Sequence, residues 1–182
     1  MSENFPMPME YDVLDNLPDF CTKRTLILGC GNLLFGDDGF GPAVIEYLRS
    51  NYEIPDDTYV MDVGTGVREL LFTIILSPEK VQRVVIIDAI DKGKAPGEIF
   101  ELPIEEVSVE KIDDLSLHQM PSSNLAKELM DVGVDVRILC CQAAVIPGSV
   151  GQGLSEAVKD AVARMCRFIA KEFFVDCKTS TI

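Results

Sequence analysis

The chain has 182 residues and a formal net charge of −14, and its 47 % hydrophobic share is typical of a globular protein. This length suits one domain whose core is large enough to need no disulfide scaffold. The excess of acidic side chains repels phosphate backbones and argues against a nucleic-acid partner. We also expect no membrane partner, because no basic amphipathic stretch and no apolar run of about 18 residues is present.

The six cysteines and the N-terminal sequence indicate the cellular compartment. No two cysteines form a C-x-x-C pair, which is typical of reduced thiols in the cytosol. The first twelve residues, MSENFPMPMEYD, are polar and acidic, unlike a secretory signal peptide. We therefore predict a cytoplasmic protein.

The N-terminal half of the chain predicts two strands, each followed by a helix. Residues 1–22 carry three prolines and little periodicity, which predicts an N-terminal arm. The continuous apolar run at 25–32 predicts a buried strand, and Gly41-Pro42 opens the next helix. A second strand is expected at 58–63, followed by a glycine turn and a helix from Val67 that ends before Pro78.

The C-terminal half continues the alternation of strands and helices. Further strands are predicted at 83–90 and 136–142, a short edge strand at 98–102, and helices at 122–131 and from Leu154 to Phe173. Residues 103–124 form a long connection without clear period, and such connections are often functional. We expect a single domain over 23–175 and a tail at 176–182. The alternation predicts an α/β fold with a mostly parallel sheet covered on both faces.

Three polar features follow strands of the predicted sheet, at the edge where ligands bind in such folds. Asp37-Asp38 come after the first strand, Asp88 ends the strand at 83–90, and His118 lies in the long connection. Each also has a simpler interpretation. The aspartates could be solvated residues of a glycine turn, Asp88 a helix cap or rim residue, and His118 a structural histidine.

His118 is the only histidine, so a structural zinc site of the Cys/His type is excluded. One imidazole with two carboxylates could bind a transition metal on one face and leave other positions open. The same three groups could instead act as general acid and base, because imidazole titrates near neutral pH.

Common cofactor and nucleophile motifs are absent. The segment Gly29-Cys30-Gly31 starts like a dinucleotide loop, but Leu34 stands where the third glycine is needed. No G-K-[ST] or G-x-S-x-G sequence occurs, so no cofactor-binding residues are predicted. A serine hydrolase using Ser116, Ser122 or Ser123 with His118 stays open. Cys30 is a candidate thiol, although a small buried hydrophobic residue is the simpler interpretation.

Several segments together resemble the nickel–iron hydrogenase maturation endopeptidases. In chain order they are LILGCGNLLFGDDGFGPAV, MDVGTG, VVIIDAI, APGEI and SLHQ, and they span about residues 24–150. The Asp-Asp-Gly-Phe-Gly-Pro run is most similar to the branch that serves the coenzyme F420-reducing hydrogenases of methanogens. The resemblance implies a three-layer α/β sandwich around a twisted, mostly parallel sheet.

The resemblance also implies the site residues. Carried over by motif, the catalytic and metal-contacting residues are Asp38, Asp88 and His118. Many family members have Glu in place of Asp38, and Asp37 is the alternative ligand in that loop. Residues expected to shape the same cleft are Asp62, Gly64 and Thr65.

The implied activity is removal of a C-terminal extension from a nickel-loaded hydrogenase large subunit precursor, which is the expected partner. The nickel would be supplied by the substrate, and other divalent metals could occupy the site in vitro. Two alternatives stay open at this point. One is a non-enzymatic maturation chaperone that senses nickel loading, and the other is a Ser- or Cys-dependent hydrolase.

Overall fold

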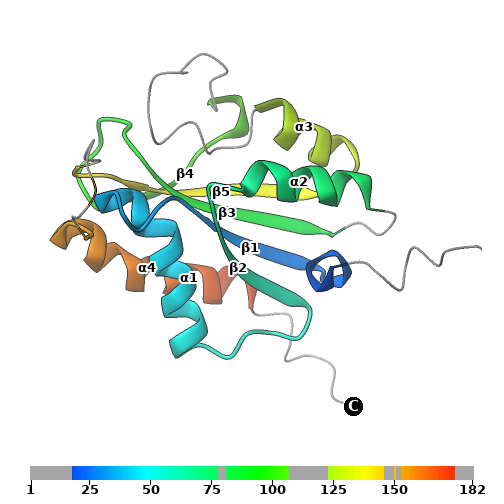
Figure 1. The fold of residues 1–182 in the computed structure, drawn as a ribbon, viewed down its shortest axis with the longest axis horizontal. Helices are drawn as coiled ribbons and strands as arrows, with labels where there is room; N and C mark the ends of the chain where they lie inside the picture. The colour runs from blue at the N-terminus through cyan, green and yellow to red at the C-terminus, as the bar shows by residue number, and fades with distance from the viewer. Residues whose placement is uncertain (1–17, 78–80, 107–122, 146–149, 151–152, 175–182) are drawn as a thin grey trace, which may run out of the picture.

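A five-stranded sheet forms the centre of the molecule, with strand order β2-β1-β3-β5-β4 (Figure 1). The computed structural model describes residues 18–77, 81–106, 123–145, 150 and 153–174. Neighbouring strands pair in parallel except β4, which lies antiparallel to β5 at one edge. The strands are β1 (Thr25–Cys30), β2 (Thr58–Gly64), β3 (Arg83–Ile90), β4 (Ile99–Glu101) and β5 (Asp135–Gln142).

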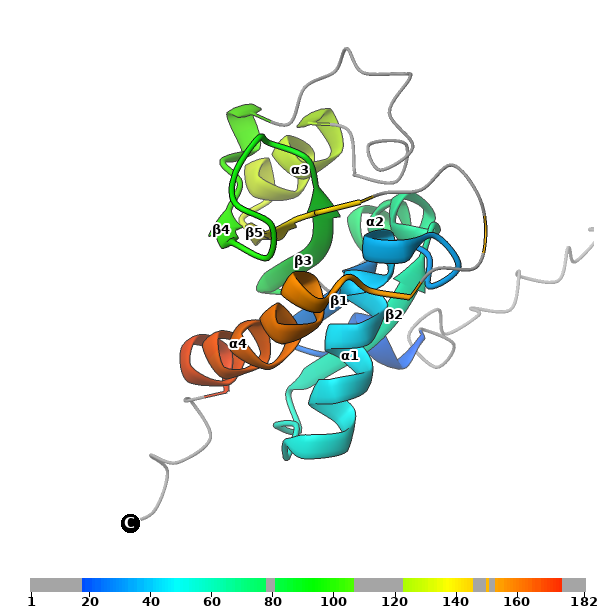
Figure 2. The ribbon, with the colours of Figure 1, turned by 90° about the vertical axis from the view of Figure 1, so that its left-hand side faces the viewer.

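Helices cover both faces of this sheet, which confirms the predicted three-layer α/β sandwich. The helices form two layers, one on each face, as both ribbon views show (Figures 1 and 2). The first face carries α1 (Phe40–Asn51) and α4 (Glu156–Phe173). The second carries α2 (Val67–Leu76) and α3 (Ser123–Asp131).

The central strands are apolar throughout because both of their faces are buried. Every residue of β1 is buried, and so is every residue of β3 after Arg83. Alternate side chains enter opposite layers: Leu26 and Leu28 pack with α2 and α3, whereas Ile27 packs with α1 and α4. The predicted strand at 25–32 ends earlier, at Cys30, because Gly31 turns the backbone with a φ of 121°.

Part of the predicted N-terminal arm packs against the sheet. Residues Asp19–Thr22, in the predicted arm, form a 3-10 helix that buries Cys21 and brings the ring of Phe20 against Tyr59. The rest of the arm, residues 107–122 of the long connection and the predicted tail lie outside the described residues. None of the described helices has the length and apolar composition needed to cross a membrane.

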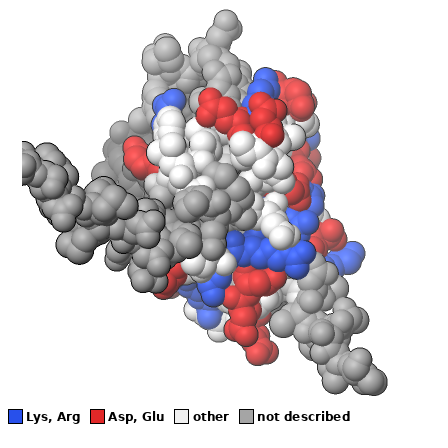
Figure 3. Space-filling model, turned by 90° about the vertical axis from the view of Figure 1, so that its right-hand side faces the viewer, with Lys and Arg blue, Asp and Glu red and all other residues white. Residues whose placement is uncertain are grey.

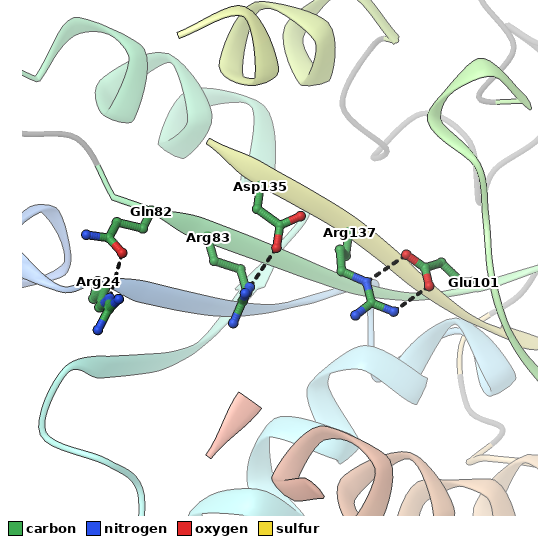
Figure 4. Close-up of polar contacts among 6 residues, drawn as sticks. All are labelled: Arg24, Gln82, Arg83, Glu101, Asp135 and Arg137. Atoms are coloured by element: carbon green, nitrogen blue, oxygen red, sulfur yellow. Dashed lines mark hydrogen bonds and ion pairs between the residues drawn. The ribbon is translucent and has the colours of Figure 1, made fainter. Parts of the chain in front are cut away.

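The C-terminal end of α4 is held by two arginines from the sheet. The guanidinium carbons of Arg83 and Arg137 lie 5.4 and 5.3 Å from the centre of the Phe173 ring. Arg83 also pairs with Asp135 at 2.7 Å, and Arg137 binds Glu101 through two nitrogens (Figure 4). Cations near a helix C-terminus are favourable because the helix dipole is negative there. On this side of the molecule Lys and Arg form a band beside Asp and Glu (Figure 3).

Phe173 should therefore contribute strongly to stability. Replacing it with Ala removes a ring that is 7 % exposed and leaves a cavity beneath two arginines. We expect the free energy of unfolding to fall by about 3 kcal/mol, and by less for Phe173→Leu, measured by urea unfolding. Phe72→Ala is the control, because that ring is 49 % exposed and its loss should matter little. Equal losses at the two positions would contradict this assignment.

Candidate functional site

The glycine-rich loop between β1 and α1 folds tightly against the carboxyl ends of the strands, the side that faces the viewer in Figure 2. A Cβ atom on Gly31 would lie 1.8 Å from the carbonyl oxygen of Asp38, and one on Gly41 would lie 2.1 Å from that of Cys30. Only glycine permits these approaches. The backbone N–H of Asn32 donates to the Asp38 carbonyl at 3.1 Å, which closes the loop.

Asp38 lies in a short 3-10 helix (Gly36–Gly39) and is 4 % exposed. Its Oδ2 accepts a hydrogen bond of 2.7 Å from the Asn32 N–H, whereas Oδ1 is buried without a partner among the described residues. Burial raises the pKa of this carboxyl group, and the hydrogen bond from Asn32 opposes that rise. The alternative of a solvated turn aspartate is therefore wrong for Asp38.

Asp88 presents a second buried carboxylate. Asp88 was expected to end its strand, but β3 continues through Ala89 to Ile90. The Asp88 side chain is 1 % exposed. Oδ1 accepts the Ala89 N–H at 2.8 Å, and Oδ2 has no partner among the described residues. Burial, and then the charge of Asp38, hold the pKa of this group well above its ordinary value, against the Ala89 hydrogen bond.

The two unpartnered oxygens are of the chemical type that binds divalent cations. A buried carboxylate oxygen without a donor is unfavourable, and repulsion between two such groups adds to the penalty. A cation bound by both oxygens would satisfy them, and hard oxygens are accepted ligands of divalent metals. No group of three potential ligands occurs among the described residues, and the third predicted ligand, His118, lies outside them. The three-residue set therefore stays a prediction.

Asp37, the alternative ligand, has no free oxygen. It is 0 % exposed, so the interpretation as a solvated turn residue is also wrong here. Both of its oxygens accept hydrogen bonds from the segment between β5 and α4: Ala144 N and Val145 N at 2.8 and 2.9 Å, and Ser155 N and Oγ at 2.7 and 3.0 Å. Of the two adjacent aspartates, Asp38 is thus the one that offers an unpartnered oxygen. No motif in the sequence indicates these contacts.

The residues expected to shape the cleft lie beside the glycine-rich loop. Gly64, with a φ of 50°, ends β2 and accepts the Gly31 N–H at 3.1 Å, so the two loops are joined. Asp62 is exposed, and its Oδ1 accepts the Gly64 N–H at 2.8 Å. Thr65 is exposed as well. A cavity of about 440 Å³ between β4, β5 and α4 is lined by none of these residues.

The described cysteines do not supply a nucleophile. Cys30 and Cys140 lie on the strands at either side of β3, level with Asp88, and both are fully buried. Burial, and then the negative charge of Asp88, raise the pKa of both thiols well above its usual value. Because the thiolate is the reactive form, this raised pKa argues against Cys30 as the nucleophile of a thiol hydrolase. Ser116, Ser122 and the side chain of Ser123 lie outside the described part of the chain.

Comparison with known proteins decides the family. Residues 42–172 match the family model of the hydrogenase maturation proteases. The chain belongs to this family. A candidate hydrogenase maturation protease of Methanocaldococcus jannaschii is 35 % identical over 82 % of this chain and 96 % of its own. The delta subunit of coenzyme F420 hydrogenase from Methanothermobacter thermautotrophicus is 32 % identical over 82 % of this chain and 94 % of its own.

Solved structures of hydrogenase maturation proteases share the fold. The [NiFe] hydrogenase maturation protease HycI of Thermococcus kodakarensis aligns with a TM-score of 0.64 and 28 % identity, over 82 % of this chain and 91 % of its own. The maturating endopeptidase HybD of Escherichia coli aligns with a TM-score of 0.61 and 29 % identity, over 81 % and 90 %. Because the members of this family are peptidases, this hydrogenase maturation protease is a peptidase.

The buried carboxylates should make the metal-free protease less stable as pH rises. The folded state holds the Asp88 proton to a higher pH than the unfolded chain does, so it binds more protons over the interval between the two pKa values. The free energy of unfolding then falls as pH rises through that interval. Asp88→Asn keeps the shape and removes the charge.

In the presence of a chelator at pH 7.5, we expect Asp88→Asn to have a higher melting temperature than the wild type. The increase should be about 2–4 °C for each kcal/mol gained in the free energy of unfolding. The difference should shrink as pH is lowered toward the ordinary range of a carboxyl group. Glu53→Gln, an exposed acid, is the control and should leave the melting temperature unchanged. An Asp88→Asn protein less stable than wild type at pH 7.5 would contradict this charge penalty.

Proposed function

We propose that this protease removes the C-terminal extension of a nickel-loaded [NiFe]-hydrogenase large subunit precursor of the F420-reducing class. Asp38, Asp88 and His118 would bind the nickel that the precursor already carries. The observation that supports this most is the pair of unpartnered, buried oxygens on Asp38, in the loop after β1, and on Asp88, in β3.

The donor set favours a metal that arrives with other ligands. Two carboxylates and one imidazole leave coordination positions open, unlike a structural zinc site closed by four ligands. The substrate's own ligands to nickel would fill these positions. A metal held near a peptide bond can polarise its carbonyl or activate water, so the enzyme needs no nucleophile. This agrees with the buried, protonated state of Cys30 and Cys140.

The surroundings of the two carboxylates also suit a peptide substrate. Leu33 and Leu34 follow Asn32 in the glycine-rich loop and are each 55 % exposed. Val145, whose carbonyl accepts the Asp37 N–H, is 53 % exposed on the adjoining segment. Apolar side chains at the rim of a polar site can bind the residues beside a scissile bond. The F420 class is supported by the similarity to the delta subunit of coenzyme F420 hydrogenase.

The site assignment predicts loss of cleavage when any of its three residues is replaced. We expect His118→Ala, Asp38→Asn and Asp88→Asn each to reduce processing of nickel-loaded precursor at least a hundredfold, because the remaining residues cannot bind the metal in the required geometry. Processing is measured as the mass lost from the precursor C-terminus. That loss also separates a protease from a chaperone, which would bind the precursor and leave its mass unchanged.

Glu53→Gln serves as the control for removal of an acid far from these residues and should cleave like the wild type. Circular dichroism of every variant reports whether the fold persists. Cleavage at the wild-type rate by folded His118→Ala would exclude that residue from the site.

A second prediction concerns the source of the metal. The protease, after treatment with a chelator and removal of that chelator, should cleave nickel-loaded precursor and leave nickel-free precursor intact. The protease purified alone should carry little metal, because its ligands do not close the coordination sphere. Equal cleavage of both precursors would refute nickel-guided recognition. A stoichiometric, tightly bound metal in the purified enzyme would indicate an ordinary metalloprotease instead.

A further inference from the structure

Asp37 lies in the glycine-rich loop and is held by side-chain hydrogen bonds from another segment of the chain. One buried carboxylate accepts four hydrogen bonds, and no lysine or arginine is among the donors. The donors are three backbone N–H groups and one hydroxyl group. Hydrogen bonds to a charged acceptor are about twice as strong as neutral ones, so this arrangement fixes the positions of all the groups that donate.

These bonds join parts of the chain that are far apart in sequence. Ala144 and Val145 follow β5, and Ser155 is the N-cap of α4, 118 residues beyond Asp37. The Ser155 hydroxyl makes no capping bond to its own helix and donates to Asp37 instead. A negative charge at this position also interacts favourably with the N-terminal end of the α4 dipole. The Asp37 N–H donates in turn to the Val145 carbonyl at 3.3 Å.

Asp38 is the next residue and shares the same short 3-10 helix. Its own backbone is held by two further bonds: its N–H donates to the Phe35 carbonyl at 3.2 Å, and its carbonyl accepts from Asn32. Neither bond connects this turn to β5 or α4, whereas those from Asp37 do. The bonds of Asp37 therefore attach this turn to β5 and α4, an attachment that the bonds of Asp38 do not supply.

We infer that Asp37 is a positioning residue and is not itself a metal ligand. By binding the β5–α4 segment, it holds the Asp38 carboxylate in a fixed position relative to Asp88. This inference rests on the proposed metal site. It assigns opposite roles to two adjacent residues of the same type. A misplacement of a site group by about 1 Å can reduce a rate a hundredfold, so a rigid attachment at this position has a direct effect on chemistry.

The test is a titration of the full-length protein with cobalt(II), a probe whose absorption spectrum reports the ligand geometry. Asp37→Asn keeps the shape of the side chain but turns an N–H donor toward groups that donate. We expect it to weaken cobalt binding about tenfold and to change the spectrum, as loss of an orienting group around a metal does. Ser155→Ala removes only the hydroxyl donor and should weaken binding less.

Phe173→Leu is the matched control, because it perturbs the opposite end of α4. It should lower the melting temperature without altering cobalt affinity or the spectrum. A purely structural role for Asp37 predicts the same behaviour for Asp37→Asn, and unchanged binding in both Asp37→Asn and Ser155→Ala would overturn the inference. If Asp37→Asn does not fold, Ser155→Ala alone decides: binding equal to wild type refutes the inference.

Asp38→Asn and Asp88→Asn distinguish failure of the inference from failure of the proposed site. Both should abolish cobalt binding if the site is correct. Wild-type binding in these two variants would refute the metal site itself, whatever Asp37 does. Loss of binding in both, with no effect of Asp37→Asn or Ser155→Ala, would leave the site in place and refute only the role of Asp37. A third outcome is that Asp37→Asn abolishes cobalt binding whereas Ser155→Ala keeps the wild-type spectrum. This outcome would indicate that Asp37 binds the metal directly, and it would also refute the inference.

Discussion

Burial of the Asp38 and Asp88 carboxylates at one end of the sheet opposes folding, because each has an oxygen with no donor among the described residues. Desolvation favours the protonated form of both groups. The rest of the structure has to hold them in place against that preference. It does so with tightly packed glycines, with backbone N–H groups from Asn32 and Ala89, and with a sheet whose central strands are buried on both faces.

Stability is supplied elsewhere in the same layers. The two hydrophobic clusters on either side of the sheet consist of side chains that are almost entirely buried. At the opposite end of the strands from the carboxylates, charged residues are paired, and Phe173 packs beneath two guanidinium groups. These contacts offset the unfavourable burial of the two carboxylates.

Periodicity predicted the strands and helices because parallel strands buried on both faces are continuous apolar runs. The depth of Asp88 was not predictable from those runs, since nothing in RVVIIDAI says how far the helices extend over the strand. The family resemblance pointed to Asp38 and Asp88 as site residues, which stays a prediction, and their separate environments depend on the fold. The bonds from Asp37 to Ser155 cross 118 residues between positions that belong to no shared motif. The place of His118 relative to both aspartates stays a prediction, because its segment has no regular period and lies outside the described residues.

The span from Asp37 to Ser155 has a consequence for the order in which the protein becomes functional. During synthesis the glycine-rich loop leaves the ribosome long before α4 does, and until α4 arrives the Asp37 carboxylate lacks two of its four donors. Contacts between residues so distant in sequence form late, because the chain between them must first be ordered. An incomplete chain therefore has the aspartates but not the scaffold that fixes them. The turn that holds Asp37 and Asp38 therefore gains its full set of hydrogen bonds only after α4 has packed onto the sheet.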